Sequence, residues 1–285
     1  MKLTSESSDY CNREVTRQSL ALEYRPNRSF VESLALRLSV PWELMKRIGR
    51  AFGDTWNHIA FRTFWGEGVF SSITHFVIGN FEDVRVRDAL SLIREFSPHR
   101  ATPDVGDEVV YGSFSTNAAT MLAALFLRHS GRLLQIVTNG KPEHKWEGTL
   151  ICYGSSEWNL KTFDIERSAA PLCEFVFDQA GRRAFEMGEL QYTIEDCGGT
   201  TYDKAILLRL TNQENPEHCY IVCAGLSEWG SLAAVHYLTN NWKVLHKRFD
   251  EFYRRRDFCV LLQVPYGQFE KATEIASAVR LGNSA

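Results

Sequence analysis

From residue 108 onward the chain alternates short, continuous apolar runs with longer helical stretches, and this rhythm constrains the fold more than any other feature. The apolar runs predict strands at 108–111, 133–137, 149–153, 174–177, 205–210, 219–224 and 258–264. The stretches between them predict helices at 117–128, 159–167, 230–240 (extending to about 254) and 269–279. Continuous apolar strands need burial on both faces, so we expect an α/β fold with a mainly parallel, Rossmann-like sheet flanked by helices. The region 179–202 predicts loops or edge hairpins, with an antiparallel edge strand at 191–194.

The N-terminal third has a different pattern. It begins with a polar stretch, and a capping-box spacing at 29–32 then starts a helix to about Leu38. Pro41 suits the first turn of a second helix that should end near Gly53. A further helical stripe follows at 82–96. We therefore expect a polar tail, a small helical module, a linker and an α/β ligand-binding domain, at 1–27, 28–97, 98–107 and 108–285.

The composition excludes several classes of protein. A formal net charge of −3 argues against nucleic acid held over the whole surface, although it permits a local basic patch. The polar N-terminus has no apolar signal segment, and no stretch reaches the ~18 apolar residues of a membrane span. Four of the seven cysteines (Cys152, Cys219, Cys223 and Cys259) lie in or beside apolar runs and predict reduced core thiols. We expect a cytoplasmic protein with no metal, no cofactor and no membrane partner.

A short pattern, Tyr-Gly-Ser-x-x-x-Asn, occurs at 111–117 and again at 153–159, each time between an apolar run and a predicted helix. A looser version occupies 223–230. In a parallel sheet such turns share one edge, where backbone N–H groups and hydroxyls converge. The pattern predicts a site for a small anionic or nucleotide-like ligand, formed by Gly112, Ser113, Asn117, Gly154, Ser155, Asn159, Gly225 and Ser227.

The same residue types are also good turn and capping residues, so a purely local role stays open. Glu157 and Glu228 each lie in a Ser-Glu-Trp triplet within these turns. A carboxylate beside an aromatic ring can contact a ribose or act as a general acid or base, which makes both residues catalytic candidates. The alternative is an exposed acid in the first turn of a helix, where its charge suits the helix dipole. Whether the protein is an enzyme stays undecided.

Residues 31–48 resemble the helix-turn-helix pattern of bacterial regulators. Ala35 takes the small position of the first helix, and four apolar residues fall at the core spacings of that family: Leu38, Val40, Met45 and Ile48. Ser39 stands where the family usually has glycine. The resemblance implies DNA contacts from Trp42, Lys46, Arg47 and Arg50. Two packed helices that bind no DNA would give the same apolar spacing.

A second resemblance lies between Tyr202 and Leu238. The pattern Arg-Leu-x-Asn-x-x-Asn-Pro at 209–216, with Ala-Gly at 224–225 and Ala-Ala at 233–234, is similar to a segment of uncharacterised prokaryotic α/β proteins. Such chains sometimes carry an N-terminal helix-turn-helix. The resemblance implies an intracellular, prokaryotic protein and brings no known activity.

These observations favour an intracellular sensor or regulator. Its α/β domain would recognise a nucleotide-like or phosphorylated small molecule, and its N-terminal module would couple that event to DNA or to a protein partner. The alternative is a nucleoside or dinucleotide glycosidase or hydrolase that uses Glu157 or Glu228 as acid/base. A membrane-surface role for the aromatic stretch 56–81 is a third hypothesis, and a homodimer stays open as the oligomeric state.

Overall fold

The computed structural model of the 285-residue chain describes residues 42–79, 105–138, 148–168, 172–250 and 256–280. Within these ranges the side chains of residues 42–53, 105–112, 138 and 168 are not described. The chain divides into two compact units, residues 1–56 and 57–285. The predicted tail at 1–27, the predicted helices at 29–38 and 82–96 and most of the predicted linker at 98–107 lie outside the described residues.

Helix α2 (Trp42–Trp65) is followed by η1 (Glu67–Phe70) and strand β1 (Thr74–Ile78). The helix passes through Gly53, where the sequence predicted its end. One glycine inside a helix costs only about 1 kcal/mol. Further along the same helix Phe61, Phe64 and Trp65 are fully buried, so their packing outweighs that cost.

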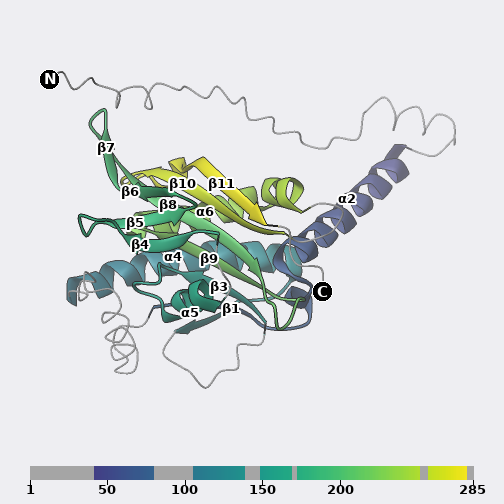
Figure 1. The fold of residues 1–285 in the computed structure, drawn as a ribbon. Helices are drawn as coiled ribbons and strands as arrows, with labels where there is room; N and C mark the ends of the chain where they lie inside the picture. The colour runs from purple at the N-terminus through teal and green to yellow at the C-terminus, as the bar shows by residue number, and fades with distance from the viewer. Residues whose placement is uncertain (1–41, 80–104, 139–147, 169–171, 251–255, 281–285) are drawn as a thin grey trace. The chain divides into compact units, whose positions relative to one another are not determined.

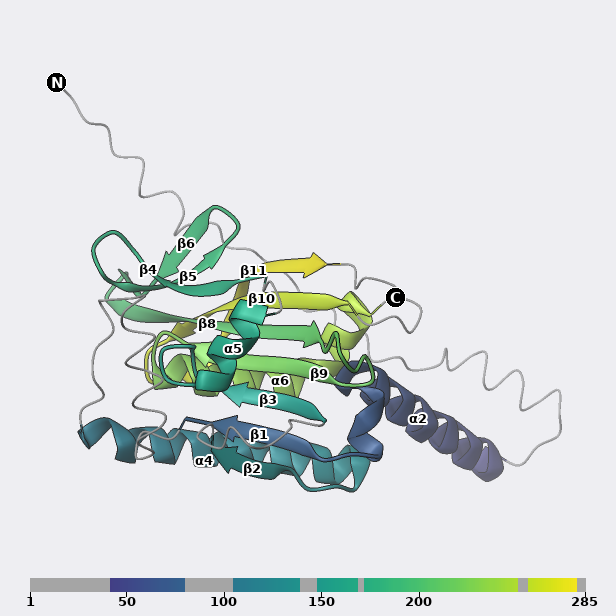
Figure 2. The ribbon, with the colours of Figure 1, turned by 60° about the horizontal axis from the view of Figure 1, so that its bottom comes forward.

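Seven of the eight strands of the main sheet follow the order β11-β10-β8-β9-β3-β1-β2 (Figure 2), and the eighth, β7, pairs with β8. Its remaining members are β2 (Gln135–Thr138), β3 (Thr149–Tyr153), β7 (Glu195–Cys197), β8 (Thr200–Thr211), β9 (Cys219–Gly225), β10 (Asp257–Pro265) and β11 (Thr273–Arg280). The β1–β2, β1–β3 and β3–β9 pairs are parallel. The β7–β8, β8–β9, β8–β10 and β10–β11 pairs are antiparallel. The prediction of a mainly parallel, Rossmann-like sheet is therefore wrong, because the sheet is mixed.

The antiparallel half has a simple cause. Strands β8 and β9 are joined by the short turn 212–218, and a connection of this length joins only antiparallel neighbours. Both strands are buried along most of their length, because the sheet is covered on both faces. Continuous apolar runs therefore report two-sided burial correctly, and they carry no information about strand direction.

Two predicted elements have the wrong type. The predicted strand 108–111 lies inside helix α4 (Val105–Ser130), whose Ala118, Leu122 and Phe126 recur at helical spacing and are buried. The predicted helix 269–279 is a short turn, η2 (Phe269–Lys271), followed by β11. Exposure alternates along β11, as expected of an edge strand that is partly open to solvent.

Different elements cover the two faces of the sheet (Figures 1 and 2). Helix α4, helix α6 (Glu228–Phe249) and the last turns of α2 pack on one face, where Phe61, Leu122 and Trp242 belong to one apolar cluster. Helix α5 (Leu160–Ser168) and a three-stranded antiparallel sheet lie on the other, contributing Ile165 and Phe185 to a second cluster. The small sheet consists of β4 (Glu174–Phe177), β5 (Arg183–Met187) and β6 (Leu190–Thr193). Strand β6 confirms the antiparallel edge strand predicted at 191–194.

The four cysteines predicted as core thiols are all buried and form no disulfide: Cys152, Cys219, Cys223 and Cys259. Burial raises the pKa of the Cys152 thiol to about 12. A thiol of this kind stays protonated and packs as a small apolar side chain, so the prediction of reduced core cysteines is confirmed.

Candidate functional site

The parallel half of the sheet contains a topological switch point, where the connections from two adjacent strands, β1 and β3, lead to opposite faces of the sheet. Strands β2, β1, β3 and β9 are adjacent in that order. Helix α4, which follows β1, packs on one face, whereas α5, which follows β3, packs on the opposite face (Figure 2). In open α/β sheets ligands bind outside the carboxyl ends of the strands at such a switch point. The residues that follow β3, 154–159, occupy this position.

The turn after β3 starts with a glycine that its backbone requires. Gly154 has φ of 101°, which an L side chain rarely adopts, and its N–H donates to Cys223 O at 2.9 Å. The N–H groups of Trp158 and Asn159 both donate to Ser155 O, at 3.0 and 2.9 Å. The turn is therefore tied to β9 and closed on itself before α5 begins.

Asn159 is fully buried and uses both ends of its amide within the protein. Its Nδ2 donates to Val77 O at the end of β1 and to Tyr153 O at the end of β3, both at 3.0 Å. Its Oδ1 accepts from the N–H groups of Lys161 and Thr162, at 3.0 and 3.2 Å, and so caps α5. The predicted ligand residue Asn159 thus joins β1 to β3 and caps a helix, with no hydrogen-bonding group left for a ligand.

Glu157 differs, because it is a carboxylate buried beside an arginine. Its side chain is 2% exposed, and Arg183 Nε lies 2.8 Å from its Oε2. Arg183 Nη2 also donates to Oε1 at 3.2 Å. The guanidinium lies over the Trp158 ring, 5.4 Å from its centroid, and its side chain is 34% exposed. Arg183 comes from β5, which sequence reasoning placed among loops or edge hairpins, so no local pattern indicated this partner.

Ser155 is the second unusual group of the turn. The residue is 2% exposed, and its hydroxyl has no hydrogen-bond partner among the residues that the structure describes. Burying a hydroxyl without a partner costs about 1–3 kcal/mol. Within the described chain Ser155 is therefore an unpaired hydrogen-bonding group two residues before Glu157, in the turn at the switch point.

In the third predicted turn, after β9, the hydrogen-bonding groups of Ser227 and Gly230 are paired within the protein. Asp203 of β8 accepts hydrogen bonds from Ser227 Oγ at 2.5 Å and from the Gly230 N–H at 2.8 Å, so it caps α6 from a neighbouring strand. Burial raises the pKa of this carboxyl, against the lowering effect of those hydrogen bonds. Gly225 lies against the helix: a Cβ placed on it would be 2.4 Å from Ser231 N. Gly225 and Ser227 thus allow a close approach of strand and helix.

The first copy of the repeated pattern is not a turn. Gly112, Ser113 and Asn117 lie within α4, and the side chains of Ser113 and Asn117 are exposed. The two copies share residue types and differ in backbone conformation. The structure therefore places only the 154–159 and 225–227 turns at the ends of strands.

The other predicted site residues lie elsewhere. Glu228 is half-exposed in the first turn of α6. The residues predicted to contact DNA lie on the first turns of α2, where side chains are not described: Trp42, Lys46, Arg47 and Arg50. Their proposed role stays a prediction.

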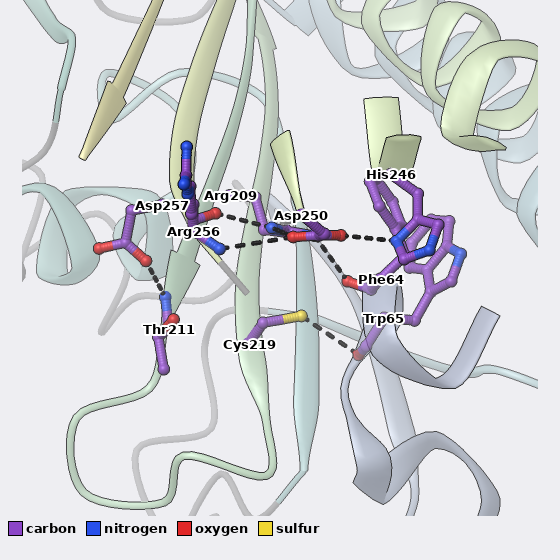
Figure 3. A network of polar contacts seen from close by, with 9 residues as sticks. All are labelled: Phe64, Trp65, Arg209, Thr211, Cys219, His246, Asp250, Arg256 and Asp257. Carbon is purple, nitrogen blue, oxygen red and sulfur yellow. Dashed lines mark hydrogen bonds and ion pairs between the residues drawn. The ribbon is translucent and has the colours of Figure 1, made fainter. Parts of the chain in front are cut away.

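A buried polar network occupies the opposite edge of the sheet (Figure 3). Arg209 of β8 pairs with Asp250 through both terminal nitrogens and also donates to Phe64 O at 3.1 Å and to Arg256 O at 2.7 Å. Asp250 accepts a further contact from His246 Nδ1 at 2.8 Å. The guanidinium is 2% exposed, so this network joins the ends of α2 and α6 to the sheet and offers no surface to a ligand.

Comparisons of the chain with protein-family models, with curated proteins and with solved structures find no match. Among the described residues no helix is both long and apolar enough to cross a membrane. The candidate site therefore rests on the geometry of this chain: a buried carboxylate paired with a partly exposed guanidinium, and a buried hydroxyl, in the turn that follows β3.

Proposed function

We propose that the protein is an intracellular binding protein whose α/β unit recognises a nucleotide-like small molecule through its hydroxyl groups. The observation that carries the proposal is the Glu157–Arg183 pair beside Ser155 at the switch point. A carboxylate at this position of an α/β sheet is suited to accept hydrogen bonds from a ribose. The guanidinium of Arg183 lies over the Trp158 ring and is partly exposed, so its planar outer side can stack with a base.

Phosphate is the less supported part of such a ligand at these turns. An anion at a helix N-terminus needs free N–H groups. In α5 those of Lys161 and Thr162 already donate to Asn159, and in α6 that of Gly230 donates to Asp203. The ligand class that fits is therefore a nucleoside or sugar that presents hydroxyl donors to Glu157 and Ser155.

Replacement of Ser155 by alanine tests this proposal, because it separates binding from folding. Its hydroxyl has no partner within the described chain, so Ser155→Ala should leave the thermal midpoint unchanged or raise it. The same change should weaken a ligand two- to tenfold, the effect of about one hydrogen bond. We would titrate adenosine, AMP, ADP-ribose and ribose 5-phosphate by isothermal calorimetry. Ser113→Ala, the same motif position on the exposed face of α4, is the matched control and should change neither quantity.

Two results would contradict the proposal. No heat from any of the four compounds with the unmodified protein would remove the binding function. Binding that is equal in the unmodified protein and Ser155→Ala would remove the ligand from this turn. If one of the compounds binds, a fluorescence-anisotropy titration with a mixed-sequence DNA duplex, with and without that compound, would test whether ligand binding changes the affinity of the protein for DNA.

A glycosidase is the second candidate, since Glu157 is a buried carboxylate beside an aromatic ring. The guanidinium contact favours a base or nucleophile over a general acid, because a carboxylate held by Arg183 accepts hydrogen bonds. Release of free base from the same compounds, followed by chromatography, separates the two functions. In a glycosidase, Glu157→Gln would abolish release and keep binding.

A further inference from the structure

A separate pocket of about 300 Å³ opens at the other edge of the sheet. It lies between the end of α2, the short helix η1 and the turn that joins β8 to β9. Six residues line it: His58, Arg62, Glu67, Phe70, Ser71 and Glu217. The pocket lies at the amino end of β9, whereas the β3–α5 turn follows the carboxyl end of the parallel strand β3. Its volume is at the lower end of the range for small-molecule sites.

The base of this pocket is held by backbone contacts. The N–H of Gly68 donates to Glu217 O at 3.2 Å, which fixes η1 against the β8–β9 turn. A Cβ on Gly68 would lie 1.9 Å from Cε1 of His218, so only glycine allows this approach. Ser72 Oγ donates to Gly68 O at 2.8 Å and closes the end of η1. The position of Glu217 relative to η1 is therefore set before any ligand arrives.

The charges in the pocket leave one carboxylate uncompensated. Arg62 and Glu67 form an ion pair at 2.9 Å and balance each other. The carboxylate of Glu217 has no ion pair or hydrogen bond among the residues that the structure describes. The pocket also has aromatic lining, because the His58 ring stacks on Phe70 with centroids 4.2 Å apart. An unpaired carboxylate and an aromatic ring in one pocket are the combination that attracts a cation with an apolar stem.

We propose that this pocket binds a small primary amine. The ammonium group donates to the Glu217 carboxylate and the alkyl stem packs on Phe70, with Ser71 at the rim as a further acceptor. The charge of Glu67 is compensated by Arg62, which leaves Glu217 as the carboxylate that receives the ammonium group. The site is independent of the β3–α5 turn, so it stands or falls apart from the function proposed above.

Calorimetric titration of the full chain with putrescine tests the proposal, and 1,4-butanediol serves as the uncharged analogue. We expect saturable heat with putrescine and none with the diol. Glu217→Gln keeps the shape of the side chain and removes its charge, and it should weaken putrescine at least tenfold. Glu214→Gln is the control, because this exposed residue lies in the same turn and does not line the pocket.

Each outcome decides the question. No saturable heat with the unmodified chain up to 10-millimolar putrescine, or equal heat with the diol, would overturn the proposal. So would equal weakening by the two glutamine substitutions, because that result indicates general attraction by surface charge. Loss of heat in Glu217→Gln alone, with an unchanged thermal midpoint, supports the site.

Discussion

Replacement of Asn159 by alanine should destabilise the protein strongly, although the sequence marks this residue as a ligand contact. Its side chain makes four hydrogen bonds, two to the carbonyls of Val77 and Tyr153 and two from the first turn of α5. All four are made by a residue with no exposed surface. Alanine removes the donor and the acceptor together and supplies no replacement.

The size of the effect follows from these contacts. Loss of a helix cap costs about 1 kcal/mol. Each carbonyl that loses its buried donor adds about 1 kcal/mol, at the lower end for an unsatisfied group. The sum is about 3 kcal/mol, and for a unit of this size that lowers the thermal midpoint by roughly 6–12 °C. Native proteins have a free energy of unfolding of about 5–15 kcal/mol, so a variant that loses about 3 kcal/mol should still fold.

Urea unfolding followed by far-ultraviolet circular dichroism measures this quantity. Asn117→Ala is the matched control, because Asn117 holds the same motif position and is exposed on α4. It should change the unfolding free energy by no more than about 0.5 kcal/mol. A loss of unfolding free energy below about 1 kcal/mol for Asn159→Ala, or equal losses for both variants, would refute the conclusion that Asn159 stabilises the fold by linking β1, β3 and α5.

Two further substitutions test the packing around the sheet. Burial alone would raise the pKa of Asp250, but Arg209 and His246 lower this pKa below its ordinary value. The ionised carboxylate therefore stabilises the fold above about pH 4, and this stabilisation is lost as the pH falls through the lowered pKa. Asp250→Asn should therefore cost about 3–5 kcal/mol at pH 7, because it leaves Arg209 buried without its counter-charge. Urea unfolding at several pH values should show the difference from the unmodified protein shrinking in acid, and a constant difference would contradict this reasoning. Gly225→Ala should lower the unfolding free energy by about 3 kcal/mol, because the added Cβ meets the backbone of α6. Gly188→Ala is the control, since Gly188 has open space and a φ of 64°, and it should cost about 1 kcal/mol in the same assay. Equal costs would contradict the close approach of Gly225 to α6.

The strands of the sheet could be predicted where they are buried on both faces. The run 149–153 matches β3, and 205–210, 219–224 and 258–264 lie within β8, β9 and β10. Their direction could not be predicted, because the apolar pattern depends on burial alone. The decisive feature was the short β8–β9 turn, which forces antiparallel pairing and ends the parallel half of the sheet.

The repeated motif shows why turn residues alone do not locate a site. Gly154 follows a buried strand and adopts a positive φ, whereas Gly112 lies inside a long helix. What distinguishes the two is the flanking chain: the four buried strand residues 149–152 precede Tyr153, whereas the segment before Tyr111 is already part of α4. Arg183 was equally out of reach, because it approaches Glu157 from a strand 26 positions further along the chain.

Helices α5 and α6 begin at the carboxyl ends of β3 and β9, and the side chains that cap them restrict which ligands this edge of the sheet can bind. Asn159 and Asp203 fill the places where an α/β protein of this topology would otherwise bind a phosphate. Asp203 also brings a buried carboxyl to the N-terminus of α6, which would repel an anion there. The turn after β3 also contains the buried carboxylate of Glu157, paired with Arg183, and the buried hydroxyl of Ser155, on which the proposed function rests. Recognition at this edge should therefore depend on hydroxyl groups, and adenosine should bind at least as well as AMP; a strong preference for the phosphorylated compound would place the ligand at another part of the protein.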